Sequence, residues 1–374
     1  MKYQIRDYKY DLLLLFTFAI VVGIIEYCYP MALFSWDGNY YVEYSISLGD
    51  GIRPLGYSFL LRMLYFISPS IMLVVYAQFF LFFIAIWFFL SEIKRTFSLT
   101  DFQGYLLGVT LLVEPGILYS CFSILSDLLY TCFSLFYITT LLAYLRTKNP
   151  VYIVLHSILI FFCIETRYTA LFYPFLSCSA IIFWNKDYKA TIAICVLLLA
   201  VFAIDQKINI DRNRKAFGVP VYAAFSGWTS ANNVMPVLQR IHGDTRYIDD
   251  PELRKMHDFM LKYFDTTSYT VEGSAPDWIW DSRSPLMMIS KNIEDSIKKI
   301  DPNKVKPFGS MHIAAPLFAK YATYIKLHYP YEFFKDFIVP NFQTLVHPMD
   351  GDMSDYYVGP ETKQEVLDRY HLKR

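Results

Sequence analysis

Residues 70–90 read SIMLVVYAQFFLFFIAIWFFL and contain no charged side chain. The hydrocarbon core of a membrane is about 30 Å thick, and a helix of about 20 apolar residues crosses it. Six other segments of the first 205 residues are also strongly apolar. The sequence therefore predicts seven membrane-spanning helices, near residues 11–29, 70–90, 103–119, 125–145, 150–165, 168–184 and 189–205.

The composition agrees with a membrane protein. Of the 374 residues, 55% are hydrophobic and 18% are charged, whereas soluble proteins carry about 25% charged residues. The formal net charge is +0, so the chain has no basic excess that would suit nucleic acid, and we expect no nucleic-acid partner. All six cysteines precede residue 205, so no disulfide framework is expected in the rest of the chain.

The chain changes character after residue 205, where charged residues, Asn, Pro and Trp become more frequent. We expect two domains: an all-α transmembrane module at 1–205 with an outer loop at 30–69, and a small, mainly helical extracytoplasmic domain at 206–374. Apolar stripes predict helices over 249–264, 289–300 and 316–337, the last interrupted at Pro330. Within the outer loop, residues 57–67 are apolar but too short to span, which favours an interfacial helix.

The orientation follows from Lys and Arg residues near the span ends, because these are enriched on the cytoplasmic side. One side holds nine of them and the other three. The nine are Lys2, Arg6, Lys9, Lys94, Arg95, Arg146, Lys148, Lys186 and Lys189, and the three are Arg53, Arg62 and Arg167. We expect a cytoplasmic N-terminus, and residues 206–374 outside the cytoplasmic membrane, which is expected to be bacterial.

Six ionisable residues fall at the predicted outer ends of the spans: Glu26, Asp37, Glu114, Asp127, Glu165 and Arg167. A charge in the middle of a span costs about 2.5–3.5 kcal/mol, so each one calls for an explanation. For Glu26 and Glu114, a position at the membrane interface explains the charge as well as a functional role does. For Asp37, Asp127 and Arg167 the neighbouring residues favour function.

These neighbours form a pattern of short motifs. Residues 36–41 read WDGNYY and residues 51–60 read GIRPLGYSFL; Pro115 to Asp127 precede a long span; and residues 165–168 read ETRY, ahead of an apolar run and Pro174. Together, over roughly residues 10–205, they resemble the GT-C glycosyltransferases. The group that they resemble most includes protein O-mannosyltransferases and lipid A aminoarabinose transferases, which use polyprenyl-phosphate sugars.

The resemblance implies a fold of seven membrane helices with a large first external loop. It also implies a polyprenyl-phosphate sugar donor and a lipid, glycan or protein acceptor at the outer face. Two differences from the family stand out. Many members add further spans, whereas residues 205–374 contain no long apolar run, and Asp127 stands where relatives often have Glu.

The implied chemistry assigns roles to these residues. A carboxylate within reach of the acceptor hydroxyl can act as general base, for which we choose Asp37. Asp127, at the position that resembles the family's second external acidic residue, is expected to be catalytic as well. Arginine pairs two phosphate oxygens through its planar fork, so Arg167 and Arg53 are expected to bind the donor phosphate. A single displacement would invert the anomeric configuration. The residues expected to line the substrate are Tyr40, Tyr41, Tyr57, Glu114 and Glu165.

Simpler interpretations remain open for several of these residues. Asp37-Gly38 is also a common turn signal, and Arg53 could anchor at the lipid headgroups. Arg167 could pair with Glu165 if the helix breaks between them, since residues two apart on a helix do not face each other. The tyrosines could belong to an interfacial aromatic belt.

No cofactor is certain from the sequence. His347, Asp350, Asp352 and Asp355 have a spacing that could bind a divalent cation, but a solvated acidic loop explains them more simply, because the EF-hand pattern is absent. The chain has no P-loop, G-x-G-x-x-G, H-E-x-x-H or G-x-S-x-G motif. Two other classes stay open: a transporter or flippase, and a non-catalytic membrane subunit of a glycan-assembly complex.

Overall fold

The computed structural model describes residues 8–28, 32–34, 36–47, 52–238, 240–241, 248–266, 278–301 and 308–346. Within these ranges every regular element is a helix, and one isolated bridge pairs Leu33 with Ser123. The α-helices are α1 (Tyr8–Cys28), α2 (Trp36–Ser47), α3 (Gly56–Ile67), α4 (Ile71–Phe97), α5 (Asp101–Leu112), α6 (Pro115–Phe122), α7 (Ser126–Thr147), α8 (Pro150–Thr166), α9 (Tyr173–Trp184), α10 (Tyr188–Phe217), α11 (Ala224–Asn232), α12 (Met235–Leu238), α13 (Pro251–Thr266), α14 (Pro285–Ile300), α15 (Gly309–His328), α16 (Pro330–Phe333) and α17 (Val339–Val346).

The described residues form two compact units. The first contains those from 8 to 47 and from 54 to 205, and the second contains Ile52, Arg53 and those from 206 to 346. The division after Asp205 falls inside α10, which contributes to both units. Arg53 therefore belongs to a different unit from the other residues expected at the site.

Among the described helices, four are individually long and apolar enough to cross a membrane: α1, α4, α7 and α10. The pair α5 and α6 would add a fifth span, although the two helices are bent by 58°. Helices α8 and α9 are apolar but shorter. The chain thus has the helices of a multi-pass membrane protein, while the expected number of seven spans is not confirmed.

The span expected at residues 103–119 is broken into α5 and α6. Proline stands in the first turn of α6, where its missing N–H costs nothing, and the Glu114 carboxylate caps that helix by accepting a hydrogen bond from Ile117 N at 2.6 Å. Glu114-Pro115 therefore stops one helix and starts the next. The span expected at 103–119 thus corresponds to two helices bent by 58°, a break that a count of apolar residues passes over.

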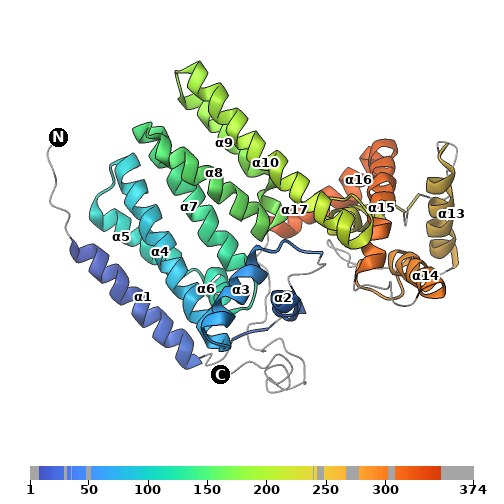
Figure 1. Cartoon of the computed structure of the whole chain (residues 1–374), viewed down its shortest axis with the longest axis horizontal. Helices are drawn as coiled ribbons and strands as arrows, with labels where there is room; N and C mark the ends of the chain where they lie inside the picture. Colours follow the sequence, from blue (N-terminus) through green and yellow to red (C-terminus); the bar gives the residue numbers. More distant parts are fainter. Residues whose placement is uncertain are drawn as a thin grey trace. The chain divides into compact units, whose positions relative to one another are not determined.

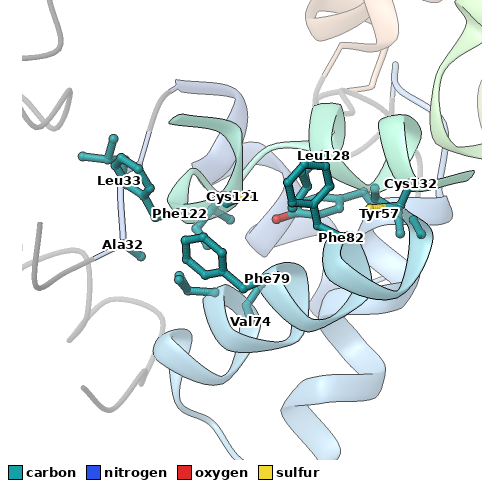
Figure 2. Close-up of a cluster of buried hydrophobic side chains, with 14 of the residues drawn as sticks. Ala32, Leu33, Tyr57, Val74, Phe79, Phe82, Cys121, Phe122, Leu128 and Cys132 are labelled. Atoms are coloured by element: carbon teal, nitrogen blue, oxygen red, sulfur yellow. The ribbon is translucent and has the colours of Figure 1, made fainter. Parts of the chain in front are cut away.

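Within the first unit, α4, α7 and α8 lie side by side (Figure 1). Figure 2 shows the core that joins α4 to α3, α6 and α7: Phe82, Tyr57, Leu128 and Cys132 meet at one end, and Phe79 meets Phe122 and Cys121 at the other. Lipid chains are as apolar as these side chains, so close packing, rather than transfer out of water, favours the assembly.

An ion pair joins α4 to α7 near the C-terminal ends of both helices. Arg146 Nε and Nη2 donate to the two carboxylate oxygens of Glu92, at 2.7 and 2.9 Å. The Glu92 side chain is only 5% exposed, whereas that of Arg146 is 33% exposed. The ion pair is bidentate. The charge of the Glu92 carboxylate is stabilised mainly by Arg146, because little solvent reaches it.

A buried polar cluster joins α7, α8 and α9. The Ser177 hydroxyl lies 2.8 Å from both Tyr137 Oη and His156 Nε2, and His156 Nδ1 lies 3.1 Å from Thr140 Oγ1. The Tyr137 ring stacks on the imidazole with ring centroids 4.6 Å apart. Polar side chains of this kind hold helices together where no water is present to satisfy them.

Replacing Ser177 with alanine is expected to lower the free energy of unfolding by about 1 kcal/mol, because interhelical hydrogen bonds in membranes average about 0.6 kcal/mol and two are lost here. Denaturant unfolding of the detergent-solubilised protein measures the change. Ser179→Ala, at an exposed position on the same helix, should leave the stability unchanged. Equal losses in the two variants would show that the cluster contributes nothing specific.

The second unit is built around α11 and α15, which pack closely together. Trp228 of α11 is fully buried and donates its indole N–H to the carbonyl of Met311 at 2.9 Å. Trp278 is fully buried as well, whereas Trp280 is 48% exposed. The helices expected over 249–264 and 289–300 correspond to α13 and α14, and the one expected from 316 begins earlier, at Gly309, with Pro316 inside it.

Candidate functional site

The chain that follows α1 is pinned to the segment between α6 and α7. Leu33 N donates to Phe122 O at 2.8 Å, and Ile124 N donates to Leu33 O at 2.9 Å. Helix α2 begins three residues after Leu33, and a Cβ on Gly38 would lie only 2.7 Å from Ile124 O. Only glycine allows this approach. Asp37, in the first turn of α2, is therefore held beside the strand-like segment that leads into α7.

The next turn of α2 contacts the first residue of α7. Tyr41 Oη lies 2.9 Å from Ser126 Oγ, and both side chains are buried. The Tyr41 ring meets the ring of Tyr57 edge-on, with centroids 5.1 Å apart, and Ser58 Oγ donates to Tyr41 O at 3.2 Å. Since Ser126 directly precedes Asp127, these contacts bring the start of α2 and the start of α7 to the start of α3.

The start of α3 also packs against the end of α8. A Cβ on Gly56 would lie 2.5 Å from the carbonyl oxygen of Glu165 and 3.0 Å from Thr166 Oγ1. The G-x-R-P-x-G-Y motif and the E-T-R-Y motif are therefore in backbone contact at Gly56. The two motifs are far apart in the chain, so the sequence alone did not indicate this contact.

Arg167 ends α8 in an extended conformation, and its guanidinium forms an ion pair with Asp127 at the start of α7. The ion-pair partner of Arg167 is thus Asp127 and not Glu165, the partner weighed from the sequence. Both side chains keep access to solvent, with 34% of Arg167 and 45% of Asp127 exposed. Two of the residues expected at the site are therefore directly joined, in a place that a ligand can reach.

One functional-site neighbour was missed by the sequence reasoning. Gln78 of α4 is buried, accepts a hydrogen bond from Tyr57 Oη at 2.7 Å, and donates to Cys121 O at 2.8 Å and to Ser123 O at 3.1 Å. It fixes Tyr57 and the segment before α7 to the same helix. The available signal was a single amide side chain inside the otherwise apolar residues 70–90.

The pKa of Tyr57 is raised well above its usual value. Burial is the main cause, because it disfavours the phenolate, and the neighbouring Tyr41 and Asp127 add to the effect. Tyr57 therefore stays protonated and acts as a hydrogen-bond donor to Gln78. It has the properties of a structural support for the cluster rather than of a proton acceptor.

The other residues expected at the site lie apart from this cluster or have another visible role. The Tyr40 ring packs against the tilted ring of Tyr44 with centroids 4.1 Å apart, Glu114 caps α6, and Glu26 accepts a hydrogen bond from Tyr76 Oη at 2.5 Å. Arg53, in the second unit, lies over the Phe225 ring at 5.5 Å from its centroid.

The expected cation ligands Asp350, Asp352 and Asp355 lie outside the described residues, as does His347. Within the part of the chain that the structure describes, no group of three or more His, Cys, Asp or Glu side chains could hold a metal ion.

Gly56→Ala is expected to lower the free energy of unfolding by about 1–3 kcal/mol, because the added Cβ would overlap the Glu165 carbonyl and push α3 off α8. Thermal unfolding of the purified protein measures this. Gly23→Ala is the matched control, since a Cβ on this α1 glycine meets no atom within 4 Å. A Gly56→Ala protein as stable as the Gly23→Ala protein would contradict the close contact.

Four motif-bearing segments thus meet in the first unit: the starts of α2, α3 and α7 and the end of α8. Comparison with known proteins adds no family assignment. No protein-family model, no curated protein and no solved structure matches the chain.

Proposed function

We propose that the protein is a glycosyltransferase that transfers a sugar from a polyprenyl-phosphate donor to an acceptor at the outer face of the membrane. The observation that supports this most is the ion pair of Arg167, at the end of α8, with Asp127, at the start of α7. The start of α2, which carries Asp37, packs against the segment that leads into the same helix. Contacts made by Gly38, Tyr41 and Gly56 hold those helices together. Charged residues that served only solubility at the span ends would not need an ion-pair partner from another motif.

In this proposal Asp37 removes the proton from the acceptor hydroxyl as the hydroxyl oxygen attacks the anomeric carbon. General-base catalysis of this type contributes about 10²–10⁴ in rate. The bond from the anomeric carbon to the phosphate oxygen breaks in the same step, and the phosphate leaves with the bonding electrons. One displacement of this kind inverts the anomeric configuration.

Arg167 stabilises the negative charge that grows on the leaving phosphate. A guanidinium carries five N–H donors, so the ion pair with Asp127 leaves donors available for phosphate oxygens. Asp127 then acts by orienting Arg167, and a planar fork fixed in orientation loses less entropy when it binds. Asp127 is thereby a positioning residue in this scheme, with Asp37 as the base.

The finer topology is part of the same proposal: seven crossings, with the N-terminus in the cytoplasm and the second unit outside. Its support is the excess of Lys and Arg at one set of helix ends. Single cysteines introduced in place of Lys148 and Ser230 test it, after the native cysteines have been replaced. A membrane-impermeant thiol reagent applied to intact cells should label position 230 and spare position 148. The reverse pattern would invert the topology.

The direct test of function is transfer of labelled sugar by the purified protein in lipid, with a panel of polyprenyl-phosphate sugars and with lipid, glycan and peptide acceptors. The expected result is transfer from one donor with inversion at the anomeric carbon. Retention of configuration would exclude the single displacement. No transfer from any donor by well-folded protein would instead favour the transporter or subunit classes.

A further inference from the structure

A cavity of about 300 Å³ lies in the first unit between α2, α3 and the start of α4. Its inner wall consists of buried aliphatic side chains, among them Val42, Leu61 and Val74. Its outer wall includes Ile46, which is 65% exposed, and Phe66, which is 71% exposed. The cavity is therefore apolar inside and opens to the surface between large apolar side chains.

The surroundings of the cavity favour a lipid chain as its occupant. Helix α4, which forms one wall, is a candidate membrane span, and α3 exposes further apolar side chains near the opening, including Met63 and Ile67. Apolar side chains exposed on the outside of a membrane protein lie against lipid. An unfilled apolar cavity loses dispersion contacts on every wall, so a chain of the adjacent lipid gains by entering it.

The opening also carries a positive charge. Arg62 lines the cavity, lies over the Phe66 ring at 5.8 Å from its centroid, and points Nη1 at Ile46 O at 3.5 Å, a long hydrogen bond. Among the residues that the structure describes, Arg62 has no carboxylate partner. A guanidinium at the edge of an apolar cavity without an acidic partner is suited to an anionic headgroup.

The start of α4 reinforces this charge at the same cavity. Ser68 and Ser70 line the cavity, and Ser70, at the N-cap of α4, makes no side-chain capping hydrogen bond. The first N–H groups of a helix lack intrahelical acceptors and carry partial positive charge, so they favour an anion. The two serines and Arg62 thus line the same cavity, and the start of α4 and the guanidinium both favour an anion there.

We propose that this cavity binds an anionic glycerophospholipid, with one acyl chain between α2, α3 and α4 and the phosphate against Arg62. It is a different site from that of the proposed donor, since none of Asp37, Asp127 and Arg167 lines it. It does lie close to that site along the helices, because Val42 follows Tyr41 and Leu61 lies one turn after Tyr57. The bound lipid therefore supports the same two helices that hold the candidate site, and the inference does not depend on the proposed function.

The test uses the full chain in detergent, stripped of native lipid, and offers it equal amounts of phosphatidylglycerol and phosphatidylcholine with identical acyl chains. Native mass spectrometry counts the lipids retained. We expect the wild-type protein to retain phosphatidylglycerol about tenfold better, which is the scale of a hydrogen bond to a charged group. Arg62→Gln should abolish this preference. Arg95→Gln, at an exposed arginine near the other end of α4, should keep it.

A cavity-filling variant provides an independent measurement. Ser45 lines the cavity from α2, so Ser45→Leu should lower the retention of both lipids because it occupies the space for the chain. Equal retention of the two lipids by the wild-type protein would overturn the proposal, and so would equal effects of Arg62→Gln and Arg95→Gln. Displacement of the bound phospholipid by stoichiometric polyprenyl phosphate, lost in Arg62→Gln, would overturn it too, by assigning the cavity to the donor.

Discussion

Asp37→Asn is expected to lower the rate of sugar transfer by about 10²–10⁴, with little change in the KM for the donor. Asparagine keeps the size of the side chain and its ability to accept a hydrogen bond, but at neutral pH it cannot take up the proton of the acceptor hydroxyl. A loss confined to kcat is the result of removing a base rather than a binding contact. Steady-state transfer of labelled sugar measures both constants.

The same substitution separates catalysis from a local structural role. Asp37 is the acidic residue in the first turn of α2, where a negative charge stabilises the helix by about 0.3–1 kcal/mol. The free energy of unfolding of Asp37→Asn should therefore fall by no more than about 1 kcal/mol. Glu43→Gln, at an exposed acidic residue of the same helix, is the matched control and should retain full activity. Transfer by Asp37→Asn within a few-fold of wild type would remove Asp37 from the mechanism.

Arg146→Ala is expected to lower the free energy of unfolding by about 3–5 kcal/mol, the range seen when one partner of a buried ion pair is removed. The reason is the location of Glu92, whose side chain is 5% exposed and would be left charged without its bidentate partner. The reciprocal change, Glu92→Ala, should cost less, because the Arg146 side chain is 33% exposed and water can solvate it. Denaturant unfolding in one detergent measures both variants.

Replacing Glu92 and Arg146 together tests the ion pair more directly than either single substitution. Replacing both residues with leucine removes the buried charge along with its partner, and such exchanges are often neutral or stabilising. The double variant should therefore be more stable than Arg146→Leu alone, a coupling that a double-mutant cycle with the single variants Arg146→Leu and Glu92→Leu reports. Arg95→Ala, at an exposed cation nearby in the sequence, should have no effect. Additive losses in the cycle would mean that the two side chains do not interact.

Apolar length predicted most of the helices in the first unit, and it failed where another signal competed with it. The segments expected at 70–90 and 125–145 correspond to α4 and α7, which carry no competing signal. Glu114-Pro115 divides the span expected at 103–119, and this helix N-cap followed by proline was present in the sequence. Helix α10 continues to Phe217, well beyond the apolar residues that predicted its end at 205, because charged residues such as Lys207 and Arg214 are good helix formers.

The candidate site was predictable in its residue types and not in its contacts. Motif resemblance selected Asp37, Asp127 and Arg167, but only the fold pairs Arg167 with Asp127 rather than with Glu165. Gln78 is visible in the sequence as a single amide within an apolar run, but its partners are not. The same holds for the ion pair of Glu92 with Arg146, because partners far apart in the chain leave no pattern in a single sequence. Arg53 shares a motif with Gly56 and Tyr57, yet it packs with the second unit, since chain continuity does not determine the domain to which a loop residue belongs.

The bridge between Leu33 and Ser123 sets an order on the synthesis of the protein. Its two hydrogen bonds close a loop that contains α2 to α6, so the two bonds of Leu33 cannot both form until residue 124 has been made. Ribosomes add about 5–20 residues per second, so several seconds pass between the synthesis of Leu33 and that of its hydrogen-bond partners. The candidate base on α2 thus reaches its final place late, and a nascent chain halted before α7 would contain every motif of the first loop without the surface that positions them.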